Sequence, residues 1–312
     1  MAHITRENLS GLIPEPVTKE IFQSAIQESA VLRMGRRLPN MTAKTQAMNV
    51  LDMLPTAYWV DGDTGFKQTT HQAWDKKKLY AEELAVIVPI PEAVLDDSNY
   101  DIWGEVRPRV VEAMGKRIDE AVLFGTNKPS TWRDSIVETA TDAETVVTAT
   151  ADLYQDIMGP SGVIAKVENC GYIPNGVLSA ISMRGHLRGL TAENGRPLFI
   201  TDMQGASNYA LDGMPMNFPL NGSWDEEQAL LIVGDFSQLV YSIRQDVTYK
   251  ILTEATIVNP TTREVLYALA QQDMVALRVV MRLGWEIPNP VSAYNAQLAD
   301  FCPFAVLAPQ GD

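Results

Sequence analysis

DMVALRVVMRLGWEI (residues 273–287) is the stretch of the sequence that most strongly constrains the fold. Every odd-numbered residue from Val275 to Ile287 is apolar, whereas the even positions include Arg278, Arg282 and Glu286. Strict alternation with a period of two predicts a β-strand with one buried face and one more polar face. The run is far longer than the usual strand of about 5–6 residues, and at about 3.3 Å per residue it would extend roughly 50 Å. This length favours an elongated molecule over a compact enzyme domain.

A second alternating run precedes the first. Residues 236–252 place Leu239, Tyr241 and Ile243 on one side and polar residues such as Arg244 on the other. We expect the two long strands to belong to one sheet, in which they could pair through a shorter strand near residues 263–270.

Residues 46–88 predict a long β-hairpin whose tip is the turn-forming segment 61–65. The half of the hairpin near the tip is strongly polar. A two-stranded ribbon without an apolar face is marginal in water, so we expect it to rest on a partner chain. An isopeptide bond between a desolvated lysine, either Lys67 or one of residues 76–78, and an asparagine is a chemical alternative. Solvated surface lysines are the interpretation that we favour.

Two helical segments frame the hairpin. Residues 14–37 carry apolar residues at helical spacing and end at Gly35, which predicts a terminal helix followed by a basic arm. Residues 97–124 predict one long helix that Asp97, Ser98 or Asn99 could cap and that Gly125 ends. Pro108 predicts either a kink or a later start of this helix. Residues 150–196 predict a helix near 152–170, a short strand after Gly171, a helix near 179–190 and a turn at 193–196.

The composition bounds the function. The chain has 312 residues, a formal net charge of −14 and 46% hydrophobic residues, so it can bury a large core but lacks the basic balance of a nucleic-acid clamp. No apolar run reaches the ~18 residues of a membrane span, and the first residues lack the layout of a signal peptide. Two cysteines are too few for a disulfide framework.

Charge is distributed unevenly along the chain. Residues 134–165 contain six acids and no lysine or arginine, whereas residues 29–44 contain four basic residues and no acid. These segments are either two solvated surfaces, which we favour slightly, or a basic arm that meets an acidic surface on a neighbouring subunit.

Motifs of catalysis are missing from the sequence. The three histidines, His3, His71 and His186, do not occur in a metal-ligand spacing, and no nucleophile elbow, dinucleotide fingerprint or phosphate loop is present. We therefore predict a protein that is not an enzyme, without catalytic residues, cofactor or metal.

Several stretches, taken in order, resemble one family. They are LPTAYWVDGDTGFK in the hairpin, LAVIVPIPEAVLDDS before the long helix, RIDEAVLFGTNKP at its end, GYIPNGVL and LRGLTAENGRPLF in the middle, and the two long strands. Together they cover most of residues 14–295, and their joint order is similar to the major capsid proteins of tailed bacteriophages, with the Hong Kong ninety-seven type of fold.

The resemblance implies an α+β shell subunit divided into four parts. These are an N-terminal arm (1–44), an extended hairpin loop (45–85), a peripheral domain with a spine helix and long antiparallel strands (86–140 and 235–288) and an axial domain (141–234 and 289–312). The subunit would self-assemble into pentamers and hexamers of an icosahedral head that encloses double-stranded DNA without sequence-specific binding. The candidate inter-subunit contacts are Arg33, Arg36, Arg37, Asp61, Asp63, Lys67, Lys76, Lys77 and Lys78.

The family often begins with a long scaffold segment that is cut off during maturation. Since this chain starts with Met1 and reaches the arm almost at once, we expect a separate scaffolding protein, together with a portal and a decoration protein as further partners. The resemblance implies assembly in the host cytoplasm, location in the virion and no membrane. An encapsulin-type nanocompartment shell is the close alternative, and a cytoplasmic α+β enzyme with a deep polar pocket is the more distant one.

Overall fold

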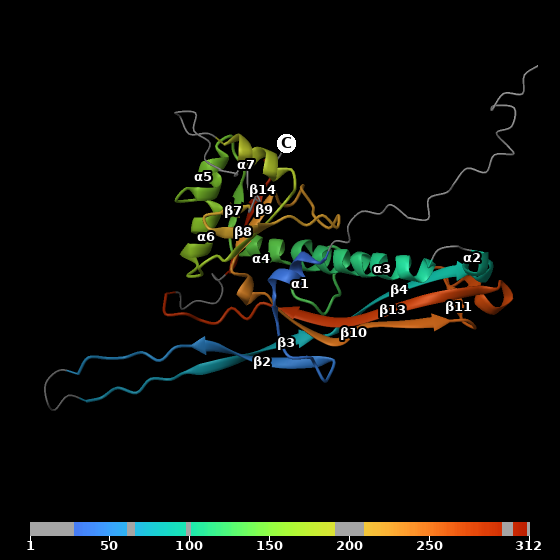
Figure 1. Cartoon of the computed structure of the whole chain (residues 1–312). Helices are drawn as coiled ribbons and strands as arrows, with labels where there is room; N and C mark the ends of the chain where they lie inside the picture. The colour runs from blue at the N-terminus through green and yellow to red at the C-terminus, as the bar shows by residue number, and fades with distance from the viewer. Residues whose placement is uncertain (1–27, 61–65, 98–100, 191–208, 295–301, 311–312) are drawn as a thin grey trace, which may run out of the picture.

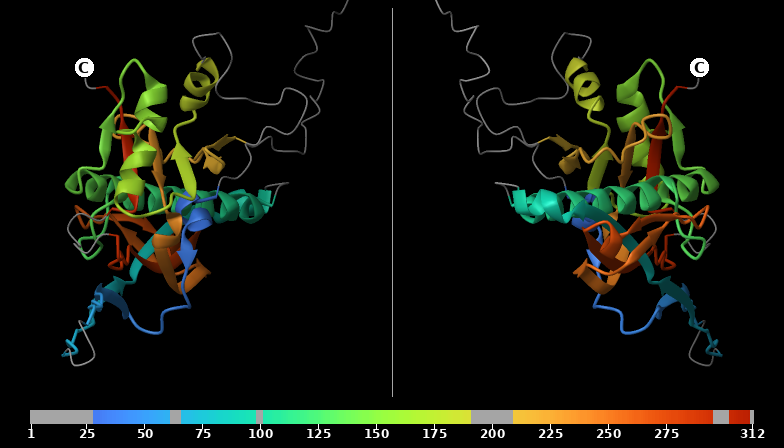
Figure 2. Two further views of the ribbon diagram at one scale, coloured as in Figure 1. Left: turned by 90° about the vertical axis from the view of Figure 1, so that its left-hand side faces the viewer. Right: turned by 90° about the vertical axis from the view of Figure 1, so that its right-hand side faces the viewer.

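The computed structural model describes residues 28–60, 66–97, 101–190, 209–294 and 302–310, and these residues form an elongated α+β molecule (Figure 1). A long helix crosses the molecule, with a sheet of long strands on one side and a six-stranded sheet near one end on the other side (Figure 2). A two-stranded ribbon projects away from both (Figure 1). The α+β class and the long strands predicted from the alternating runs are confirmed.

The strand quoted above is the centre of the long sheet. It forms β13 (Met274–Glu286), which pairs antiparallel with β10 (Val240–Leu252) on one side and with β4 (Glu82–Pro91) on the other. A short β1 (Arg36–Arg37) pairs parallel with the start of β10 and completes the order β1-β10-β13-β4. The expectation that a short strand near residues 263–270 lies between the two long strands is wrong. That segment forms β12 (Val265–Ala268), which among the described residues pairs with β11 (Thr256–Val258) in a separate small hairpin.

The two faces of β13 differ less than the alternation predicts. The odd face is buried throughout, from Val275 to Trp285. On the even face Arg278 is exposed and Arg282 half-buried, but Gly284 is buried because the backbone of the hairpin crosses directly above it. A Cβ atom at Gly284 would lie 2.6 Å from the carbonyl oxygen of Tyr80. A residue without a side chain is therefore required at this crossing.

The long helix packs on the odd face of the long sheet. Helix α3 (Ile102–Asp119) begins later than expected, because Asp101 is its N-cap and accepts a hydrogen bond from the backbone nitrogen of Gly104 at 3.0 Å. The helix includes Pro108, and its start at Ile102 is later than residue 97, as one of the two expectations from this proline had it. It continues as the π-helical segment η2 (Glu120–Phe124) and ends at Gly125 with a φ of 74°, as predicted. Val110, Met114, Ile118 and Val122 form the inner stripe of this helix and are buried in the main core.

The six-stranded sheet has a packed layer on each face. Its order is β5-β14-β9-β6-β8-β7. Leu178, Ile232 and Val306 face the main core, whereas Val177, Val233 and Leu307 face a second core under the short helices. The strands are β5 (Val146–Thr148), β6 (Gly176–Ser179), β7 (Ala210–Leu211), β8 (Met214–Asn217), β9 (Leu231–Gly234) and β14 (Phe304–Ala308). The helices beside it are α4 (Ile136–Asp142), α5 (Leu153–Met158), α6 (Val163–Asn169) and α7 (Met183–Gly189).

Local expectations in this region are partly corrected. The single helix predicted near residues 152–170 is two helices, α5 and α6, because Gly159 and Pro160 interrupt it. The strand after Gly171 and the helix before Leu190 are confirmed as β6 and α7. The turn expected at 193–196 lies outside the described residues. Three short elements complete the fold: α2 (Glu92–Asp97), η3 (Phe236–Gln238) and η4 (Leu269–Gln271).

The hairpin and the long sheet share one continuous run of chain. Strands β2 (Thr45–Met53) and β3 (Ala73–Tyr80) form the predicted ribbon. The return strand leaves the ribbon at Ala81 and continues as β4, so residues 82–88 pair with β13 instead of β2. The expectation of one hairpin over residues 46–88 is corrected in this respect.

The N-terminal helix is described only at its end. Helix α1 (Ala30–Met34) ends at Gly35, as expected, and buries Ala30 and Val31 in the main core. Residues 14–27, which carry the rest of the predicted helix, lie outside the described residues.

The crossing above β13 gives a testable prediction. We expect Gly284→Ala to destabilise the protein by about 1–3 kcal/mol, because the added methyl group meets backbone instead of a movable side chain. Gly185→Ala is the matched control, since its Cβ would meet open space in α7 and a helical alanine stabilises by about 0.5–1 kcal/mol. Chemical denaturation measures both effects, and equal stability of the two variants would contradict the crossing.

Candidate inter-subunit contact surfaces

Exposed aromatic side chains concentrate on the ribbon. Trp59 is 103% exposed and Phe66 is 97% exposed, one on each side of the tip, and Tyr58 and Trp74 are also exposed. A soluble monomer rarely leaves a group of large apolar side chains in water without a partner. The ribbon therefore carries the chemistry of a contact surface and not that of a solvated loop.

The lysines of β3 divide between the two faces of the ribbon. Lys76 and Lys78 are exposed and share a face with Trp74, whereas the intervening Lys77 is half-buried on the other face. Lys67 is exposed near the tip, and Asp61 and Asp63 lie outside the described residues. The outer face thus combines positive charge with an aromatic ring, a combination typical of protein contact surfaces.

Lys77 lies in a polar cluster at the foot of the ribbon, which we call the hairpin base cluster: Lys77, Trp132, Arg133, Trp285 and Glu286. The Nζ of Lys77 donates to the carbonyl oxygen of Ile287 at 3.1 Å. Arg133 pairs with Glu286 at 2.7 Å and lies 5.9 Å from the centre of the Trp285 ring. The residues around this cluster line an open cavity of about 500 Å³.

A second contact within this cluster holds the base of the ribbon. The indole nitrogen of Trp132 donates to the carbonyl oxygen of Tyr80 at 3.0 Å, at the point where β3 passes into β4. The rings of Trp132 and Trp285 meet edge to face, with their centres 6.4 Å apart. These contacts fix the direction in which the ribbon leaves the body.

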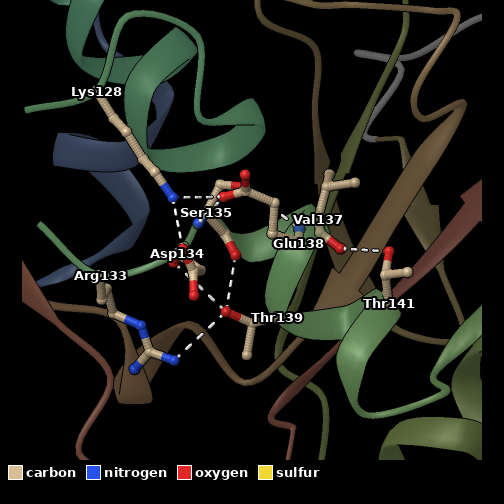
Figure 3. Close-up of polar contacts among 8 residues, drawn as sticks. All are labelled: Lys128, Arg133, Asp134, Ser135, Val137, Glu138, Thr139 and Thr141. Carbon is tan, nitrogen blue, oxygen red and sulfur yellow. Dashed lines mark hydrogen bonds and ion pairs between the residues drawn. The ribbon is translucent and has the colours of Figure 1, made fainter. Parts of the chain in front are cut away.

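The loop that supplies Trp132 and Arg133 is itself braced (Figure 3). Lys128 contacts both Asp134 and Glu138 at 2.7 Å, and Ser135 and Glu138 form a capping box at the start of α4. The hydrogen bond from Lys128 and the backbone hydrogen bond from Ser135 hold the pKa of Glu138 below its ordinary value.

This bracing bears on the predicted acidic surface. Lys128 pairs with both Asp134 and Glu138, which nevertheless stay exposed, and its single charge balances only one of them. Asp156 is buried against Thr150, which donates to it through both its backbone nitrogen and its hydroxyl. The other five acids of the segment 134–165 are exposed, so this segment retains an acidic surface.

The basic arm is bound along the edge of the long sheet. Arg33 donates to the side-chain oxygen of Asn217, and Arg37 donates to that of Asn40 at 3.1 Å. Arg36 and Arg37 are exposed in β1, beside the start of β10. The structure thus brings the three arginines together near α1 but separates them from the lysines of the ribbon (Figure 1).

Sequence reasoning missed a buried acid, Asp119, that accepts four hydrogen bonds. Asp119 is fully buried and contacts the start of α1 as well as Asn221. The signal was available, because Asp119 lies one turn beyond Gly115 on the buried side of the long helix. A carboxylate in that position requires polar partners from another segment.

The described residues offer no cluster of three or more His, Cys, Asp or Glu side chains that could hold a metal ion. In the same part of the chain, no helix combines the length and the apolar character that a membrane crossing needs. Both cysteines are buried, and burial raises the pKa of the Cys302 thiol to about 11, so this thiol is unreactive at neutral pH.

The half-buried Lys77 gives a prediction about pH. Burial lowers the pKa of Lys77 below its ordinary value of 10.5, although Glu286 raises it in part. Between the lowered pKa and 10.5 the unfolded chain binds more protons than the folded one, so the free energy of unfolding rises with pH in this window. We expect Lys77→Met to remove this rise.

Urea unfolding at a series of alkaline pH values measures the effect. Lys76→Met is the matched control, because Lys76 is exposed on the neighbouring position of β3. Parallel stability profiles of the wild type and Lys77→Met would contradict the burial of this amine.

Comparison with known proteins gives matches along nearly the whole chain. The chain is 29% identical over 287 residues to the major capsid protein of Staphylococcus phage 80alpha. The alignment covers 91% of this chain and 84% of that protein. It is 23% identical over 273 residues to the probable major capsid protein gp17 of Mycobacterium phage D29.

Solved structures agree with this result. A structure from Microbacterium phage Oxtober96 is 36% identical, with a TM-score of 0.85, and the match covers 99% of this chain and 100% of that chain. A structure from Mycobacterium phage Adephagia is 31% identical, with a TM-score of 0.84 and coverage of 100% and 99%. The model of the Phage capsid family matches residues 10–293. This is a family of shell proteins and not of enzymes. The chain belongs to the phage capsid family.

Proposed function

We propose that this chain is the major capsid protein of a tailed double-stranded DNA bacteriophage and self-assembles into the pentamers and hexamers of an icosahedral head. Membership of the family and the named relatives support the role in the shell. The observation that carries the mode of assembly is the group of exposed aromatic residues on the ribbon. These side chains gain their burial when the ribbon lies on a neighbouring subunit.

The four parts expected from the sequence are kept in this proposal. Residues 1–44 form the arm and the ribbon forms the extended loop. The long sheet with α3 forms the peripheral domain, and the six-stranded sheet with its helices forms the axial domain. The pairing of Glu82 with Leu283 supports a boundary between loop and peripheral domain at Ala81, a few residues before the expected one.

Charge complementarity supports the same arrangement. The exposed Lys76 and Lys78 give the outer face of the ribbon a positive charge, whereas the chain as a whole carries −14. Opposite charges on the two partners favour the correct register during association. A net negative shell also repels packed DNA, which keeps the genome from adhering to the wall.

The proposal also includes the other proteins with which the subunit would act. A separate scaffolding protein, a portal and a decoration protein act with this subunit, and assembly takes place in the host cytoplasm. Many weak, repeated contacts make the particle stable, because each subunit is held by several neighbours at once.

The ribbon gives the decisive experiment. We expect Trp59→Ser combined with Phe66→Ser to abolish regular shells, because the two side chains are almost fully exposed and lose only partner contacts. Removing exposed side chains leaves the free energy of unfolding within about 0.5 kcal/mol of the wild type. Electron microscopy detects the shells, and chemical denaturation of the dispersed subunit measures the stability.

A conservative variant serves as the control. Trp59→Phe combined with Phe66→Tyr retains aromatic surface at both positions and should still form particles. Normal shells from the double serine variant would contradict the contact role of the ribbon. Particles from an infected host that enclose a protein cargo and no DNA would contradict the assignment to a phage head.

A further inference from the structure

We infer that Asp119 is the positioning residue of the N-terminal arm: its carboxylate fixes the point and the direction in which the arm leaves the subunit, and it ties this exit to the loop around Asn221. The inference rests on the proposed function, in which the arm reaches neighbouring subunits. It is carried by four hydrogen bonds to one buried side chain.

Three of these hydrogen bonds come from the start of α1. The hydroxyl of Ser29 donates to Oδ1 of Asp119 at 2.5 Å, and the backbone nitrogens of Ala30 and Val31 donate to the two carboxylate oxygens at 3.0 Å each. Ser29 also accepts a hydrogen bond from the backbone nitrogen of Leu32 as the N-cap of the helix. Asp119 thus supplies partners for the first amides of α1, which have no acceptor within the helix itself.

The fourth hydrogen bond comes from a different part of the chain. The side-chain nitrogen of Asn221 donates to Oδ2 of Asp119 at 2.7 Å. Asn221 is held in turn by Ser223, whose hydroxyl and backbone nitrogen both donate to its side-chain oxygen. The carboxylate therefore joins three segments: the arm, the long helix and the loop after β8.

The backbone geometry around Asp119 allows the arm to lie close to the long helix. A Cβ atom at Gly115, one turn before Asp119, would lie 3.3 Å from the backbone nitrogen of Ser29. The glycine lets the arm approach the long helix closely enough for its amides to reach the carboxylate. Beyond Asp119 the helix changes to the π-helical form of η2, a distortion that is frequent at functional sites.

The burial of Asp119 makes the junction depend on all its partners. Burial raises the pKa of Asp119 above its ordinary value, against the four hydrogen bonds, which lower it. If a buried carboxylate loses its hydrogen-bond donors, water cannot reach its oxygens to replace them. Movement of the Asn221 loop is therefore transmitted to the start of the arm.

Further along the chain, the arm is bound by independent contacts. The hydroxyl of Tyr241 donates to the carbonyl oxygen of Leu32 at 3.0 Å, and that of Ser242 donates to the carbonyl oxygen of Pro39 at 2.6 Å. Loss of the Asp119 contacts should therefore release the start of α1 and leave residues 36–41 in place.

The variants Asp119→Asn and Asn221→Ala, made in the full-length chain, test the inference. Hydrogen exchange measured by mass spectrometry on the dispersed subunit follows the peptide that contains the amides of Ala30 and Val31. We expect exchange of this peptide to accelerate about tenfold or more in Asp119→Asn and less in Asn221→Ala. Exchange of the peptide from the centre of β13 should not change in either variant.

Glu120→Gln is the matched control, since Glu120 is the next residue and pairs with Lys116 and Arg117 of the long helix instead of with the arm. Unchanged exchange at Ala30 and Val31 in Asp119→Asn would overturn the inference. Accelerated exchange throughout the molecule would also overturn it, because Asp119 would then be a general stability residue. Ser29→Ala, which leaves Asp119 intact, repeats the test if Asp119→Asn does not fold.

Electron microscopy of the same variants separates this inference from the proposed function. Local release of the arm together with malformed shells would support both. Local release with normal shells would support the junction and overturn the role of the arm in assembly.

Discussion

The pairing of β13 with β10 on one side and β4 on the other is the constraint on which the rest of the molecule depends. This register directs every odd-numbered residue from Val275 to Trp285 to one face, and that face is the surface on which α3 packs. A slip of one residue would turn the buried set outward and remove the support of the helix. The long helix, the arm bound beside it and the ribbon all take their positions from this one alignment.

The polar interior of the molecule is concentrated where segments meet. Asp119 joins the arm to the long helix, and Arg133 with Glu286 joins the loop after η2 to the end of β13. Each junction joins polar groups at fixed positions on different segments, so it favours one arrangement of those segments. Apolar packing supplies the stability, and these junctions supply the direction in which each extension leaves the body.

The strongly periodic parts of the fold were predictable from the sequence. The strands predicted from the alternation of 273–287 and of 236–252 and the stop at Gly125 depend on local pattern, and the structure confirms each of them. The family followed from the joint order of several stretches, although none was sufficient alone. The pattern therefore predicted the class of the fold, and the resemblance to the family implied the role in a shell.

The parts that failed depend on contacts between distant residues. Period two cannot show that β12 pairs with β11 instead of joining the long sheet, nor that the return strand of the hairpin passes from β2 to β13. The burial of Gly284 on the polar face depends on Tyr80, two hundred residues earlier in the chain. The role of Asp119 was not predicted, because its hydrogen-bond partners lie on two other segments. The residues predicted to form inter-subunit contacts stay predictions.

The continuity of β3 with β4 has a mechanical consequence. Only Ala81 separates the ribbon from the long sheet along this run of chain, because β3 ends at Tyr80 and β4 begins at Glu82. A force directed along the ribbon would pull β4 along its own axis. The hydrogen bonds to β13 run across that axis and would resist such a pull together in shear, whereas a force applied at right angles would unzip them one after another. The strand pairing is thus suited to carry tension along the axis of β4.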